Sequence, residues 1–328
     1  MPRFVARCIR AALVLPVVFA TGVSTAVAQG YPNKPVRLII AQGAGSATDI
    51  MGRIIGQKIS DAVGQQVVVD NRAGAGGLLG TELAAKATPD GHTLFLASIS
   101  THGVNPALYT KLPYDPVRDF AAVSMTGLTA NLFVVHPSVA AASVSELIAL
   151  VKAKPGQLNF ASPGNGSSQH LATELFKSMA GGLKVAHVPY KGGPPAITAV
   201  MAGEVTGMMP AMPLALPHVK SRKVRAIAVT TAARIPEMPE VPAVAETVPG
   251  FEVVTWYGLM VPAATPKAVI STLNKVVVAQ LALPDTRKSL AASGLSPLAG
   301  TPEEMSGFVR AELAKWSKVA RDAGIRLD

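Results

Sequence analysis

Two stretches rich in glycine and hydroxyl groups carry the side chains best suited to chemistry. Residues 42–49 read QGAGSATD and follow the apolar run VRLIIA, and residues 164–168 read GNGSS and follow QLNFAS. Each stretch leads into a segment whose apolar residues recur at helical spacing. The first turn of a helix leaves backbone N–H groups unpaired, and its dipole favours negative charge. Both stretches are therefore suited to holding an anion.

Hydroxyl side chains strengthen this interpretation, because Ser46, Thr48, Ser167 and Ser168 can all donate hydrogen bonds. Ordinary helix capping is the alternative for either loop, with Ser46 or Thr48 as the N-cap and Asp49 in the first turn. A carboxylate at Asp49 would repel an anion unless it turned toward the helix amides, so we expect it to shape the loop. Two such loops together favour a shared site for a carboxylate.

Enzyme motifs fit these loops poorly. The glycines of residues 43–48 and 74–79 begin like a dinucleotide fingerprint, but the sixth position is Thr48 in one and Leu79 in the other, where close helix packing requires glycine. Residues 164–168 have the wrong order for a nucleophile elbow. The six histidines show neither H-x-H nor H-E-x-x-H spacing. We therefore predict no catalytic residue, no metal and no cofactor, and an exported hydrolase is the remote enzymatic alternative.

The start of the chain reads as an export signal over residues 1–28. Three arginines precede an apolar run, and an A-x-A site ends at Ala28. Cleavage there would remove the single cysteine, Cys8, and lower the formal charge from +10 to +7, because three arginines and no acidic residue leave with it. The mature protein would lie in the periplasm without disulfides. Scattered basic residues and an aromatic content of 5% argue against nucleic acid.

Strands and helices alternate along the rest of the chain. Apolar runs near residues 36–41, 65–71 and 91–98, separated by helical patterns, predict a βαβαβ unit with a parallel sheet. A second α/β set begins near residue 130, and the proline-rich residues 234–251 read as a crossover. The last helix is predicted to start at Thr301, with Glu304 completing a capping box. About 300 residues in this pattern favour two lobes.

Nine segments of the chain match, in order, the pattern of one known family. They are YPNKPVRLII, GSATD, VVVDNRAGAGG, PDGHTLFLAS, NPALYTKLPYDPVRDFAAVS, LNFASPGNGSSQHLATELF, HVPYKGGPPAI, ALPHVKSRKVRAIAVT and PEEMSGFVRAELAKWSKVARDAGI. With these segments the chain resembles the Bug-type solute-binding proteins of tripartite tricarboxylate transporters, and the resemblance covers the whole mature chain.

This resemblance implies an α/β, two-lobed periplasmic-binding-protein fold of type II, with mixed, mostly parallel sheets flanked by helices and a cleft between the lobes. Domain 1 would comprise residues 29–129 plus 255–328, and domain 2 residues 130–254. A monomer would capture a small carboxylate and deliver it to a two-subunit membrane permease. Presentation of the carboxylate to a sensor kinase remains an open alternative.

The family's ligand-binding positions transfer to this sequence one by one, and they imply contacts mainly through backbone amides and bridging waters. The implied residues are Gln42, Gly43, Ala44, Gly45, Ser46, Thr48, Asp49, Ser100, Thr101, Asn105, Ser162, Gly166, Ser167, Ser168, His170, Met209, Pro210 and Ala211.

Departures from the family pattern bear on the ligand. Gln42 and Ser46 stand where the family usually has phenylalanine and glycine, so this end of the site is more polar. Residues 209–212 lack the aspartate that can meet a cationic ligand group. Met208, Met209 and Met212 would line an adaptable apolar pocket or, alternatively, pack in the core. Aromatic dicarboxylates and aliphatic dicarboxylates or citrate-like acids both remain candidates.

Overall fold

The computed structural model describes residues 30–322 and 324–326. The described residues from Pro32 onward form one compact unit. The predicted signal at residues 1–28 lies outside the described residues. No helix in the described ranges is long and apolar enough to cross a membrane.

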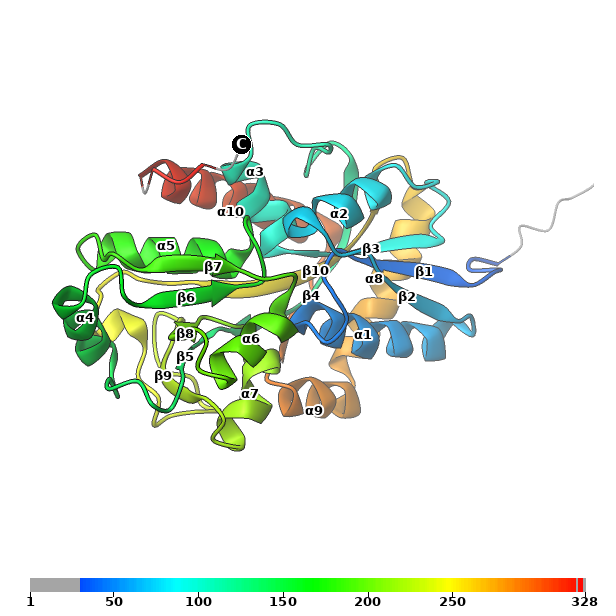
Figure 1. Cartoon of the computed structure of the whole chain (residues 1–328). Helices are drawn as coiled ribbons and strands as arrows, with labels where there is room; N and C mark the ends of the chain where they lie inside the picture. Colours follow the sequence, from blue (N-terminus) through cyan, green and yellow to red (C-terminus); the bar gives the residue numbers. More distant parts are fainter. Residues whose placement is uncertain (1–29, 323, 327–328) are drawn as a thin grey trace, which may run out of the picture. The chain divides into compact units, whose positions relative to one another are not determined.

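A six-stranded sheet forms what we call the first lobe (Figure 1), in the order β11-β4-β10-β3-β1-β2. Its strands are β1 (Val36–Ile40), β2 (Val67–Asn71), β3 (Thr93–Ser98), β4 (Phe120–Ala130), β10 (Val254–Pro262) and β11 (Ser296–Pro297). As the βαβαβ pattern predicts, β1 runs parallel to both β2 and β3. β1 lies between β3 and β2 and is buried almost throughout, which explains its continuous apolar sequence.

A five-stranded sheet forms the second lobe, in the order β7-β6-β8-β5-β9. Its strands are β5 (Leu132–Val135), β6 (Asn159–Ser162), β7 (Ala186–Pro189), β8 (Gly207–Met208) and β9 (Arg225–Val229). Only Asn131 separates β4 from β5, so the chain passes between the sheets through one residue. Asn131 receives a hydrogen bond from Thr255 Oγ1 at 2.8 Å, and its N–H donates to Thr230 Oγ1 at 3.1 Å. Asn131, where the chain leaves the first lobe, is thus hydrogen-bonded to Thr255 of β10, where the chain returns.

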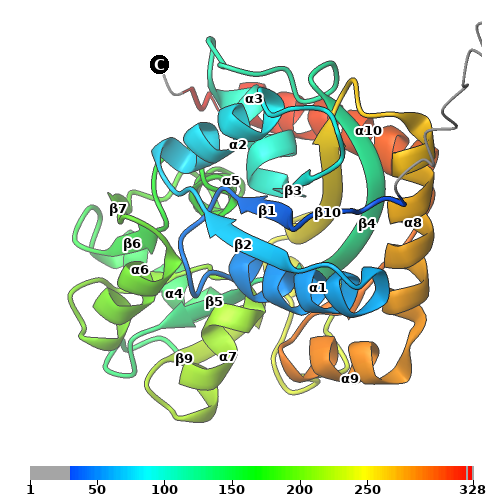
Figure 2. The same cartoon turned by 90° about the vertical axis from the view of Figure 1, so that its right-hand side faces the viewer.

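Helices flank both sheets, and Figure 2 shows α1 and α2 on opposite faces of the first. They are α1 (Ala47–Val63), α2 (Leu78–Ala85), α3 (Asn105–Leu108), α4 (Val144–Ala153), α5 (Ser168–Met179), α6 (Gly193–Met201), α7 (Met212–Lys220), α8 (Lys267–Ala282), α9 (Pro284–Ala292) and α10 (Pro302–Asp322). Short helical turns lie at η1 (Ala75–Gly77), η2 (Ser100–Val104) and η3 (Val244–Glu246). The capping box of α10 is confirmed, because Thr301 Oγ1 accepts from Glu304 N and Thr301 N donates to Glu304 Oε2.

The mixed α/β sheets are confirmed, but their expected parallel majority is wrong. Among the described residues, four strand pairings are parallel and five are antiparallel. Every antiparallel pair includes β4, β5 or β10, the strands at which the chain passes between the lobes. The eleven-residue β4 was not recognised as a strand, because its small residues, including Gly127, weaken the strand signal.

The C-terminal helix α10 is fastened to the first sheet by one carboxylate. Glu312 Oε2 accepts hydrogen bonds from Trp256 Nε1 at 2.8 Å and from Trp316 Nε1 at 2.9 Å. Both indoles are almost wholly buried. A Cβ added at Gly103 would lie 3.0 Å from Trp316 Cδ1, so α10 also supports η2. The packing of α10 therefore reaches the segment that begins with Ser100.

Candidate ligand-binding site

A cavity of about 620 Å³ lies between the loops of the two lobes. The first lobe lines it with residues 41–43, 46–48 and 73–77, and with Ser98, Ser100, Tyr109, Thr255 and Tyr257. The second lobe contributes residues 163–165, 167–169 and 190–193, and Ala211 and Leu214. Its volume lies within the range typical of small-molecule sites.

The start of α1 forms one wall of this cavity. Ser46 is the N-cap, and its side chain accepts a hydrogen bond from Asp49 N at 3.2 Å. The two capping candidates are thereby resolved in favour of Ser46. Thr48 lines the cavity and is 6% exposed, so its hydroxyl stands at the wall without serving as the cap.

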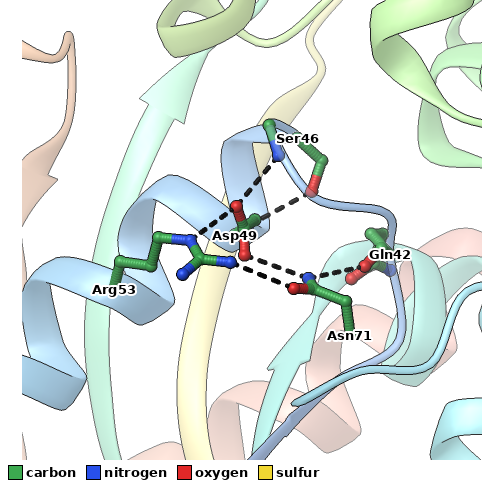
Figure 3. A network of polar contacts seen from close by, with 6 residues as sticks. Gln42, Ser46, Asp49, Arg53 and Asn71 are labelled. Carbon is green, nitrogen blue, oxygen red and sulfur yellow. Dashed lines mark hydrogen bonds and ion pairs between the residues drawn. The ribbon is translucent and has the colours of Figure 1, made fainter. Parts of the chain in front are cut away.

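Asp49 stabilises the loop of residues 42–49 through a network of hydrogen bonds, as Figure 3 shows. Its carboxylate accepts from Gly45 N at 2.9 Å, Arg53 Nε at 2.9 Å and Asn71 Nδ2 at 3.0 Å. Asn71 Nδ2 also donates to Gln42 O at 3.0 Å. Burial works against ionisation, but the bonds from Arg53, Gly45 and Asn71 keep the pKa of Asp49 below its ordinary value. The charge is therefore neutralised within the loop, outside the cavity lining.

The start of α5 forms the opposite wall. Ser167 caps this helix by accepting from His170 N at 3.2 Å, and it donates to Gly164 O at 2.7 Å. Ser168 N donates to Ser100 Oγ of the first lobe at 3.1 Å. The N-terminal ends of α1 and α5 thus face one cavity from different lobes, which is the arrangement that an anion requires.

Eight of the implied binding residues line the cavity, and ten do not. Those in the lining are Gln42, Gly43, Ser46, Thr48, Ser100, Ser167, Ser168 and Ala211. Those outside it are Ala44, Gly45, Asp49, Thr101, Asn105, Ser162, Gly166, His170, Met209 and Pro210.

Three of the ten residues outside the lining, Asp49, Thr101 and Asn105, make hydrogen bonds to the loops that form it. Thr101 Oγ1 bonds to both the N–H and the carbonyl of Ser98, and Asn105 Nδ2 donates to Gly76 O at 3.0 Å. Ala44 and Gly45 are exposed. Met209 is fully buried in one hydrophobic cluster, and Met208 and Met212 are buried in a second, so all three methionines pack in the core.

Two stacked histidines lie beneath the second-lobe loop. The rings of His170 and His187 are 4.0 Å apart between centroids and inclined by 16°. His187 Nε2 also lies 2.6 Å from Ser162 Oγ, so Ser162 and His170, which lie outside the cavity lining, both contact His187. Burial lowers the pKa of each histidine to about 4. Both rings are therefore neutral near pH 7.

Sequence reasoning missed two of the lining loops. Residues 73–77 were weighed only as a dinucleotide look-alike, although their glycines adopt positive φ and bring the backbone to the cavity. Residues 190–193 lead into α6, and the sequence analysis assigns them no contact with a ligand. The glycine pairs signal close backbone approach, but their spacing does not show which lobe they approach.

Comparison with known proteins identifies the family. The family described as tripartite tricarboxylate transporter family receptor matches residues 51–325. This chain belongs to that family. BugT of Bordetella pertussis is 36% identical over 92% of each chain, and a Pseudomonas sp. protein from the tcbD-tcbE intergenic region is 37% identical over 88% of this chain and 86% of its own length. The resemblance inferred from the sequence is confirmed.

Solved structures of related receptors share the fold. R. palustris Rpa4515 with adipate has a TM-score of 0.88 and 35% identity, covering 90% of this chain and 99% of that one. MatC (Rpa3494) from Rhodopseudomonas palustris with bound malate has a TM-score of 0.84 and 30% identity, covering 88% and 99%. Two-lobed periplasmic binding proteins of this receptor family therefore include carboxylate-bound examples.

Proposed function

We propose that this protein is a periplasmic receptor that binds a small carboxylate, without turnover, and delivers it to a two-subunit membrane permease. The observation that carries the proposal is the cavity between the N-terminal ends of α1 and α5. Among the described residues that line it, none is aspartate or glutamate. Backbone amides, the serine and threonine hydroxyls and the two helix dipoles therefore all favour an anion.

The size of the cavity bears on the ligand class. Because one water molecule occupies about 30 Å³ of liquid, a volume of about 620 Å³ corresponds to roughly twenty waters. This volume is larger than that of a four-carbon dicarboxylate, so water would bind in the cavity together with such a ligand. A longer aliphatic or an aromatic dicarboxylate fills more of the site. The relatives solved with adipate and malate support the carboxylate class.

A thermal-shift screen of the mature protein tests the binding proposal. The panel contains aliphatic and aromatic mono- and dicarboxylates, with neutral sugars and amino acids as comparison. A ligand at 100 times its Kd should add about 2.7 kcal/mol to the free energy of unfolding. Stabilisation by sugars or amino acids but by no carboxylate would overturn the proposal. Recovery of the bound acid unchanged would separate binding from catalysis.

Export and delivery require separate measurements. We propose that cleavage after Ala28 releases the protein to the periplasm, and the mass of the protein in the periplasmic fraction tests this. Uptake of the identified acid should require both this receptor and its permease. Uptake that persists without the receptor, while a sensor kinase response is lost, would instead support the sensing alternative.

A further inference from the structure

One residue of the cavity lining carries a formal charge in the described part of the chain, and that residue is Lys191. It lies in the short loop between β7 and α6 and is exposed. Its neighbours in the lining are Tyr190, Gly192 and Gly193. No acidic side chain shares the lining, so a ligand is the natural source of a compensating charge.

The backbone around Lys191 is held in place on both sides. Tyr190 N donates to Ser162 O at 2.9 Å, and Gly192 N donates to Pro163 O at 3.1 Å. These bonds attach the lysine loop to the second-lobe wall of the cavity. A Cβ added at Gly45 would lie 3.5 Å from Pro194 Cγ, so the start of α6 also meets the first-lobe loop. The lysine stem therefore begins at a fixed point where the lobes meet.

Lys191 lies nearer to solvent than the N-terminal ends of α1 and α5 do. Ser46, Ser100 and Ser168 are 8%, 9% and 2% exposed, whereas Lys191 is exposed to solvent. A ligand with a single carboxylate would bind the hydrogen-bond donors near the buried serines. The Lys191 ammonium, at the outer end of the cavity, would then have no anionic partner. The long lysine side chain can adjust to ligands of different length, because its charge sits on a flexible four-carbon stem.

We infer that Lys191 pairs with a second anionic group of the ligand, so that the receptor selects dicarboxylates over monocarboxylates of equal length. The inference rests on the proposed carboxylate-binding function. Closing the lobes over the pair would remove water and strengthen the attraction between the two charges. The inner carboxylate binds to the helix ends of α1 and α5, and Lys191 discriminates at the outer end.

Calorimetric titration of matched acids tests this inference. The probes are adipate against hexanoate and terephthalate against benzoate, each titrated into wild type, Lys191→Met and Lys191→Arg. Loss of the ammonium should weaken dicarboxylate binding roughly tenfold and change monocarboxylate binding by less than about twofold. Lys191→Arg should retain most of the preference. Lys184→Met removes an exposed lysine of the same lobe outside the cavity and should change neither.

The outcomes separate the inference from the proposed function. Equal binding of dicarboxylate and monocarboxylate by wild type would overturn the role of Lys191 while leaving carboxylate binding intact. Equal weakening of both acids by Lys191→Met would show that the lysine shapes the loop rather than pairing with a charge. Failure of wild type to bind any carboxylate in the thermal-shift panel would overturn the proposed function itself.

Discussion

The Oγ of Ser100 lies 3.2 Å from the Oγ of Ser168 and accepts the Ser168 N–H at 3.1 Å, so the two lobes are hydrogen-bonded to each other directly. Ser100 opens η2 of the first lobe, and Ser168 opens α5 of the second. Both residues line the cavity. The lobes therefore touch each other directly at the ligand site.

Close backbone approach between the lobes depends on Gly76. A Cβ at this position, which has φ +64°, would lie 2.6 Å from the carbonyl oxygen of Asn165 in the opposite lobe. We predict that Gly76→Ala weakens binding of every carboxylate by at least about tenfold, because each 1.4 kcal/mol removed from the closed state costs that factor. Small-angle scattering should show a more open protein.

Gly64 provides a matched control for this substitution. It has φ +69° in the same lobe, and nothing lies within 4 Å of an added Cβ. Gly64→Ala should therefore lose about 1–2 kcal/mol of stability through backbone strain alone and keep its affinity. Equal loss of affinity in both variants would show that strain, not contact between the lobes, governs binding.

Thr48 tests the carboxylate wall at the start of α1. Because Ser46 caps the helix, Thr48→Val should leave the melting temperature nearly unchanged. Removal of one hydroxyl donor to a charged group should weaken binding by about 1.5–3 kcal/mol. Titration calorimetry with the best acid from the screen measures this. Unchanged affinity would remove Thr48 from the ligand contacts.

How far the sequence predicts the site depends on the range of the contacts involved. The strand, turn and helix of residues 36–63 follow from local patterns, and so does the capping of α5, because their determinants lie within a few residues. Lys191 and residues 73–77 were not predicted, since their place in the lining depends on how loops from two sheets meet. His170 of α5 lies outside the lining, and its stacking partner, His187, lies on β7, so no local pattern predicts this contact.

The stacked histidines predict a loss of stability in acid. Because burial lowers the pKa of His170 and His187 to about 4 from 6.5, the unfolded chain takes up protons between these values and the folded chain does not. The free energy of unfolding should fall as the pH drops from about 6.5 toward 4, by up to about 1.4 kcal/mol per pH unit for each histidine. Half-buried His187 should contribute less than His170.

Urea unfolding of wild type and His170→Phe measures this effect. The variant keeps an aromatic ring on His187 but loses one titrating group, so its stability should fall less steeply between pH 6.5 and 4.5. Buried His102, whose pKa is also lowered, contributes equally to both proteins. Between pH 7 and 8 the two proteins should show the same pH dependence. Identical slopes in acid would mean that the stack is not protonated on unfolding.

Arg222 offers a route to higher stability. It adopts φ 57°, a left-handed conformation that costs a non-glycine residue about 1–2 kcal/mol. Arg222→Gly should therefore raise the free energy of unfolding by about 0.5–1 kcal/mol after the greater entropy of unfolded glycine is subtracted. Arg222→Ala removes the same charge but keeps the strain, and it should bring no gain. A gain of equal size in both variants would point to charge rather than backbone strain.

The bonding of both indoles to Glu312 gives the protein a built-in optical probe. The chain contains two tryptophans, and both donate to this one carboxylate, so tryptophan fluorescence originates from a single location. Trp316 also packs beneath η2, whose first residue bonds to the second lobe. Opening and closing of the receptor should therefore shift the emission of the unlabelled protein, and ligand binding can be followed in real time without a dye.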